Sequence, residues 1–126
     1  MVSSPSSSSG SKLIGKLRSA LEPVVLEGLS LEVLSALLTI AAEPGLSVNE
    51  LADRLNAPQQ TASRYASVLL GRYQEPMSVS TQRPKQPLVV QEVHANDPRK
   101  RAMFLTDRGN EFVAHLVSLL SDKKIT

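Results

Sequence analysis

The 126-residue chain contains no cysteine and no tryptophan, and only 3% of its residues are aromatic. Without cysteine it can form no disulfide, no thiolate zinc site and no thiol redox switch. The scarcity of aromatic rings argues against a single-strand nucleic-acid binder, since such proteins stack successive bases on them. A membrane-length apolar run and a secretory signal are also missing, so we expect a cytoplasmic protein. Residues 1–10 are expected to form a disordered Ser-rich tail, and residues 11–126 a single domain.

Signatures of catalysis and of cofactor binding are missing as well. The six glycines are scattered, and none begins a strand-to-helix phosphate loop. His94 and His115 have no neighbours at metal-ligand spacing. No nucleophile-elbow pattern surrounds Ser63, so a hydrolase triad built on it is unsupported. We therefore expect a protein that is not an enzyme and that needs no cofactor or metal.

Charge is distributed unevenly along the chain. The net charge is only +2, with a sequence pI of about 9.2. Between Arg83 and Arg108 there are six basic and three acidic residues, whereas the remainder has eight basic and nine acidic ones. A surface that attracts phosphate should therefore lie in the second half of the chain.

Apolar residues at helical spacing, together with start and stop signals, predict five helices. The strongest start signal is Ser47-x-x-Glu50, a capping box in which each side chain accepts from the other residue's backbone N–H. The predicted helices are Lys12 to Glu22, ended by Pro23; a core helix capped by Ser30 and running to Ala42; the helix opened by the capping box; about 59–70, after the breaker Asn56-Ala57-Pro58; and a last helix capped by Thr106.

The predicted helix over 59–70 has two unlike faces. Its apolar stripe consists of Ala62, Tyr65, Ala66 and Leu69. The opposite face, at about 100° of rotation per residue, carries Gln60, Ser63, Arg64 and Ser67. Hydrogen-bonding side chains without acidic residues suit a helix laid into a DNA major groove.

The chain texture changes after Tyr73, where prolines exclude a long helix. The segments 77–81 and 88–94 favour extended chain. A turn at Asn96-Asp97-Pro98 and a returning strand from Arg101 to Leu105 would make a hairpin with Arg99 and Lys100 at its tip. The expected fold is mainly α with a small β-hairpin wing, in the α+β class: a winged helix-turn-helix.

Four short motifs in this order resemble the DNA-binding region of MarR-type winged-helix repressors. They are S-x-N-E-L-A-x-x-L at 47–55, T-x-S-R at 61–64, D-P-R-K-R at 97–101 and L-T-x-x-G at 105–109. The resemblance implies a homodimer whose terminal helices interleave. It further implies that double-stranded DNA is the partner, and it raises the expectation of a small-molecule effector bound between the dimerisation and DNA-binding parts.

Carried onto this sequence, the resemblance implies one recognition helix, about 59–70, and one wing, about 88–105. The residues expected to meet DNA are Gln59, Gln60, Thr61, Ser63, Arg64 and Ser67 from the helix, and Arg99, Lys100 and Arg101 from the wing. Asp97 is expected to brace a wing arginine such as Arg101, because a carboxylate near phosphate is repelled.

A second reading is a winged helix that contacts another protein, as an adaptor or an inhibitor. The modest net charge and the Pro-rich, polar segment 74–87 motivate this alternative. An enzyme ranks last, since no residues supply a base, a nucleophile and an oxyanion site together.

Overall fold

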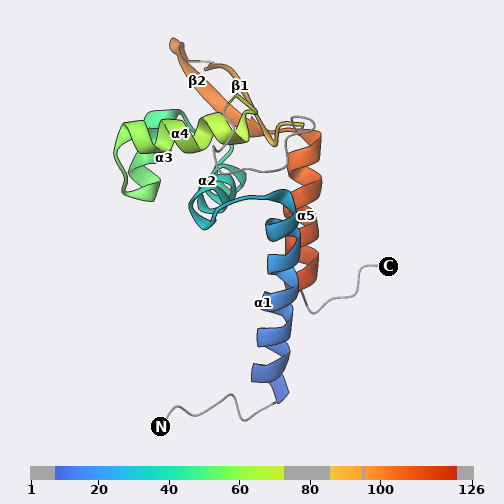
Figure 1. The fold of residues 1–126 in the computed structure, drawn as a ribbon. Helices are drawn as coiled ribbons and strands as arrows, with labels where there is room; N and C mark the ends of the chain where they lie inside the picture. Colours follow the sequence, from blue (N-terminus) through green and yellow to red (C-terminus); the bar gives the residue numbers. More distant parts are fainter. Residues whose placement is uncertain (1–7, 73–85, 95, 122–126) are drawn as a thin grey trace.

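The computed structural model describes residues 8–72, 86–94 and 96–121. Within these residues the chain forms five helices and one two-stranded antiparallel sheet (Figure 1). The elements are α1 (Ser8–Glu27), α2 (Leu31–Ala42), α3 (Val48–Leu55), α4 (Gln59–Leu69), β1 (Val89–His94), β2 (Asp97–Leu105) and α5 (Asp107–Leu120). This is the winged helix-turn-helix arrangement predicted from the sequence.

The molecule has two parts, which we name by their elements. The stalk consists of α1 and α5, which lie side by side and point away from the rest (Figure 1). The head consists of α2, α3, α4 and the β1–β2 wing. The expected extended segment 77–81 lies outside the described residues.

The hydrophobic core of the head is built around α2. One face of this helix is completely buried and packs against α3, α4 and β2. The fully buried large side chains are Val33, Leu37 and Ile40 of α2, Leu51 of α3, Leu69 of α4, Val89 of β1 and Met103 of β2. The prediction that this helix forms the centre of the core is confirmed.

Local signals fix the helix-turn-helix. The Ser47 hydroxyl accepts from the Glu50 backbone N–H at 3.2 Å, and the Glu50 carboxylate accepts from the Ser47 N–H at 2.9 Å, so the predicted capping box forms. Helix α3 ends at Asn56, which adopts a left-handed φ of 55°. Pro58 is extended and stands directly before the first turn of α4, where its missing N–H costs nothing.

Helix α1 is longer at both ends than predicted. It begins at Ser8, inside the stretch expected to be a disordered tail, and continues through Pro23 to Glu27. Packing explains the second difference, because Ala20 and Val24 on either side of the proline are buried. Tertiary contacts therefore outweigh the backbone hydrogen bond that Pro23 cannot donate.

The wing departs from the predicted hairpin at its tip. Strand β2 already begins at Asp97, which pairs with His94, whereas the next pair along the ladder joins Val93 and Arg101. Residues 98–100 are thus an irregular stretch of β2 opposite no β1 residue. Pro98 fits there because it lacks the N–H that a regular ladder position would need. Arg99 and Lys100 lie on this stretch, at the end of the wing where they are expected.

Among the described residues, no single helix is both long and apolar enough to cross a membrane. The pair Gly10–Glu27 and Leu31–Ala42 passes that test only in combination, by length and composition, with a bend of 104° between them.

Candidate nucleic-acid interface

Helix α4 presents its polar side to solvent, as its spacing predicts. Ala62, Ala66 and Leu69 are at most 2% exposed and hold the helix against the core. On the outer side Gln59, Gln60, Ser63 and Arg64 are exposed, while Thr61 and Ser67 are half-buried. The helix contains no acidic residue. Its outer face can therefore approach a polyanion without repulsion and offers several hydrogen-bonding groups.

The structure adds one cation that the sequence reasoning did not include. Arg72 is exposed three residues past the end of α4, and its backbone N–H donates to Ser67 O at 2.9 Å. Gly71 makes this ending possible with a φ of 79°. A glycine followed by a basic residue at the end of the recognition helix was the signal that could have indicated it.

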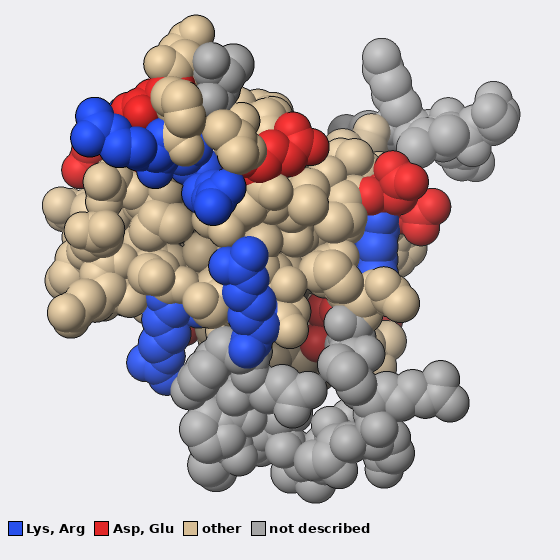
Figure 2. Space-filling view, turned by 90° about the horizontal axis from the view of Figure 1, so that it is seen from above, with Lys and Arg blue, Asp and Glu red and all other residues tan. Residues whose placement is uncertain are grey.

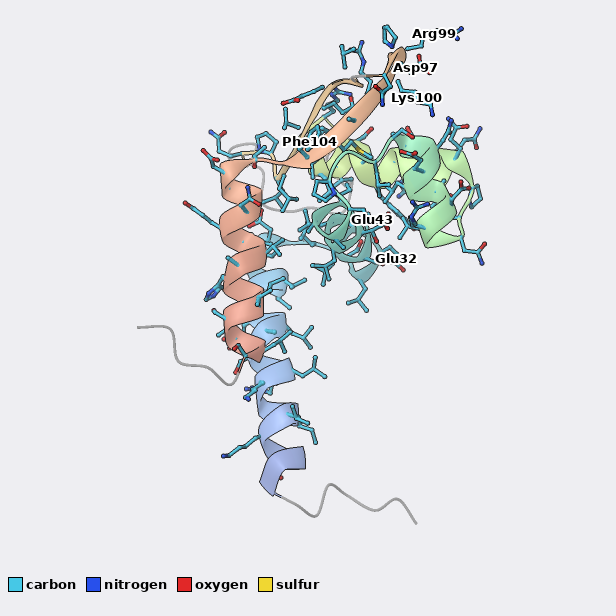
Figure 3. The ribbon with its side chains drawn as sticks, turned by 180° about the vertical axis from the view of Figure 1, so that it is seen from behind. Glu32, Glu43, Asp97, Arg99, Lys100 and Phe104 are labelled. Atoms are coloured by element: carbon cyan, nitrogen blue, oxygen red, sulfur yellow. The ribbon has the colours of Figure 1, made fainter. Side chains whose placement is uncertain are left out.

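The wing carries three exposed cations in a row, Arg99, Lys100 and Arg101. The Arg99 side chain is 94% exposed and extends from the far end of the wing (Figure 3). Asp97 Oδ1 accepts from the Arg99 backbone N–H at 3.0 Å and lies 3.9 Å from Arg99 Nε. Asp97 thus braces a wing arginine, as expected, but its partner is Arg99 rather than Arg101, because the short carboxylate closes a local turn to the residue two positions on.

Lys100 connects the wing electrostatically to the helix-turn-helix. The pKa of Glu50 is lowered, first by the hydrogen bond from the Ser47 backbone N–H, then by the Ser47 hydroxyl, and further by the charges of Lys100 and Arg54. Lys100 is thus close enough to the start of α3 to stabilise the Glu50 carboxylate. Figure 3 shows Lys100 on the part of the wing that lies above α3 and α4.

Seen from the wing side, the head displays several Lys and Arg side chains with acidic side chains between them and at the edge (Figure 2). Attraction of a polyanion to this face therefore depends on the placement of individual cations rather than on a broad positive field.

The outer side of α2 forms a separate, open depression of about 530 Å³. Its lining combines three leucines of α2 with smaller side chains and with the Glu43–Arg54 ion pair. It lies on the head, whereas the expected effector site lies between head and stalk, so the effector stays a prediction. Among the described residues no three His, Cys, Asp or Glu side chains group closely enough to hold a metal ion.

Comparisons with known proteins agree with this geometry. Residues 27–72, which include α2, α3 and α4, match the model of the MarR family. A search of curated protein sequences finds no match. The resemblance stated from the motifs is confirmed for the matched segment.

Solved structures with the same architecture include three regulators. The S. aureus MepR–DNA complex is 22% identical with a TM-score of 0.61, over 86% of this chain and 76% of that chain. CouR bound to a 23-mer DNA duplex is 23% identical with a TM-score of 0.59, over 86% of this chain and 67% of that chain. MarR is 19% identical with a TM-score of 0.58, over 86% of this chain and 70% of that chain. At these identities the similarity establishes the winged helix-turn-helix fold.

Proposed function

We propose that this protein is a sequence-specific double-stranded DNA-binding transcriptional regulator, a repressor of the MarR type that acts in the cytoplasm and is not an enzyme. Helix α4 enters the major groove, and the wing reaches the minor groove. The observation that carries the proposal is the solvent-facing polar side of α4, free of carboxylates, on the same head as a wing with exposed cations. The MepR and CouR structures, which contain DNA, support it.

The side chains divide into two roles. Gln60, Ser63 and Arg64 are placed to meet base edges, with Arg64 suited to bidentate contact with guanine. Gln59, Thr61 and Ser67 lie at the ends or flanks of the outer face and suit nearby phosphates. On the wing, Arg99 suits the minor groove, while Lys100 and Arg101 add attraction to the phosphate backbone.

A homodimer accounts for the uncovered apolar surface of the stalk. Only one side of α1 packs on α5, where Ala20 and Val24 are buried. The adjoining side is 43% to 73% exposed at its large apolar residues, which are Leu13, Ile14, Leu17, Leu21 and Val25. Val117 and Leu120 of α5 are also exposed. A continuous apolar surface of this kind marks an interaction site, and a second copy offers a matching one.

The test is selection of duplexes from a random pool at physiological salt, followed by affinity measurements over a range of salt. We expect a palindromic site and an affinity that falls with salt at a log–log slope of about −0.9 per neutralised phosphate. Arg64→Ala should relax discrimination at one position by about 1–3 kcal/mol, whereas Arg99→Ala should weaken binding to most sequences. Lys12→Ala, which removes a stalk charge, is the matched control and should change neither.

The alternative is a winged-helix adaptor or inhibitor that binds another protein, favoured by the modest net charge and by the acidic side chains on the wing-side face (Figure 2). No retention of any duplex at low salt, together with stoichiometric recovery of a protein partner, would select this alternative and reject DNA binding.

A further inference from the structure

One arginine lies where the two stalk helices meet the head. Arg108, in the first turn of α5, donates from Nη2 to both carboxylate oxygens of Glu27, at 2.7 and 2.6 Å. Its Nη1 donates to Gln86 O at 2.7 Å. Glu27 is the last residue of α1, and Gln86 lies three residues before β1. A single guanidinium therefore holds together the end of α1, the start of α5 and the chain leading into the wing.

Neither charge helps the helix that carries it. The positive end of a helix macrodipole is at its N-terminus, where Arg108 lies, and the negative end is at its C-terminus, where Glu27 lies. Each residue on its own would be unfavourable there. The two side chains are only 33% and 13% exposed, and they form a bidentate pair across 81 positions of sequence. The arrangement points to a connection between elements rather than to stabilisation of either helix.

The short covalent link between α1 and α2 does not by itself fix the orientation of α1 relative to the head. Between α1 and α2 there are three residues, and the first, Gly28, has a φ of 82°. Helix α5 is already attached to the head, since Thr106 N donates to Leu88 O at 3.0 Å and Thr106 Oγ1 donates to Pro87 O at 2.8 Å. The Arg108–Glu27 ion pair attaches the end of α1 to the start of α5 at this junction.

We propose that Arg108 is a positioning residue that fixes the angle between stalk and head. For its effect on DNA the inference rests on the proposed function, because in a dimer joined through the stalks this angle sets the separation of the two α4 helices. Half-site spacing on DNA follows from that separation. Arg108 thereby determines which operator spacing the dimer accepts, although it touches no DNA.

A distance measurement tests the geometry without DNA. Because the chain has no cysteine, Ser63→Cys on α4 and Ser19→Cys on the exposed side of α1 create the two sites for spin labels, one on the head and one on the stalk. Labelled protein is diluted with unlabelled protein so that only distances within one chain are recorded. We expect a narrow distance distribution in the doubly labelled parent protein, and a broadened or shifted distribution after Arg108→Gln or Glu27→Gln.

Glu43→Gln is the matched control, since it breaks a bidentate ion pair with Arg54 that lies wholly within the head. It should leave the distribution unchanged. Circular dichroism verifies that each variant is folded. If Arg108→Gln does not fold, Glu27→Gln breaks the same ion pair and provides the distance measurement. Distributions identical to the parent in the folded variants would overturn the proposal.

A DNA measurement tests the consequence. Arg108→Gln should lose roughly tenfold in affinity for the preferred full site while its affinity for an isolated half-site stays within about twofold, because only simultaneous engagement depends on the angle. Equal losses on full and half sites would overturn the spacing role. If the unmodified protein binds no duplex, the proposed function fails, whereas the distance measurement still decides the role of Arg108.

Discussion

Replacing Gly109 by alanine should destabilise the protein by about 3 kcal/mol, although alanine is the better helix former. A Cβ at this position would overlap Leu88 O and lie 3.1 Å from Leu88 C, both of which are backbone atoms. Leu88 is itself buried, so the backbone of α5 must move away from β1. Overpacking of this kind costs about 1–3 kcal/mol.

The movement also weakens two hydrogen bonds at the start of α5. Thr106 N donates to the same Leu88 oxygen, and Thr106 Oγ1 accepts from Gly109 N at 3.0 Å. Their net loss is about 0.5–1.5 kcal/mol each. Helix propensity offsets about 1 kcal/mol of these costs, which leaves a net destabilisation of about 3 kcal/mol.

Gly15 in α1 supplies the control, because the same added methyl group would have no neighbour within 4 Å. Gly15→Ala should stabilise the protein by up to about 1 kcal/mol. Urea unfolding at one fixed protein concentration measures both variants. Our account of the α5–β1 contact would be refuted by a Gly109→Ala protein as stable as the parent, or by a change of the same sign in both variants.

Further predictions concern the α3 cap and the stalk. Ser47→Ala should cost about 1 kcal/mol of unfolding free energy in urea, since it removes the hydroxyl cap of a nearly buried helix start. The pKa of Glu50 is lowered in the folded state, so its stabilising effect is present above the unfolded pKa and is lost as pH falls through the folded one. Glu50→Gln should therefore be less stable than the parent at pH 7 by a margin that shrinks toward pH 3; a constant margin would contradict the cap electrostatics. Leu17→Glu, at a position 57% exposed in one chain, should shift sedimentation from dimer to monomer without unfolding the head, whereas unchanged sedimentation would remove α1 from the interface.

Structural features that depend only on residues close together in the sequence were predictable. Ser30, Ser47 and Thr106 cap their helices as expected, because a hydroxyl that accepts from an N–H three positions later is a purely local device. The outward face of α4 followed from residue spacing alone, since the 3.6-residue period fixes which side chains share a side.

Features that depend on distant contacts were not predictable from one sequence. Nothing near Pro23 indicates that buried neighbours carry the helix past it. The Arg108–Glu27 pair joins residues 81 positions apart, and no periodicity connects them. Asp97 braces Arg99 rather than Arg101, because the irregular start of β2, which the sequence does not reveal, places the Arg99 backbone N–H and side chain next to its short carboxylate.

Helix α4 is anchored by one set of residues and presents another set to solvent, which has a consequence for engineering. Three small or aliphatic side chains, Ala62, Ala66 and Leu69, anchor the helix, and none of them faces outward. Exchange of the outward residues would leave the anchoring contacts intact, so preference for a new operator could be selected in a library without a parallel search for stabilising changes. The scaffold is in this sense modular: what holds the helix in place and what it reads are encoded at separate positions.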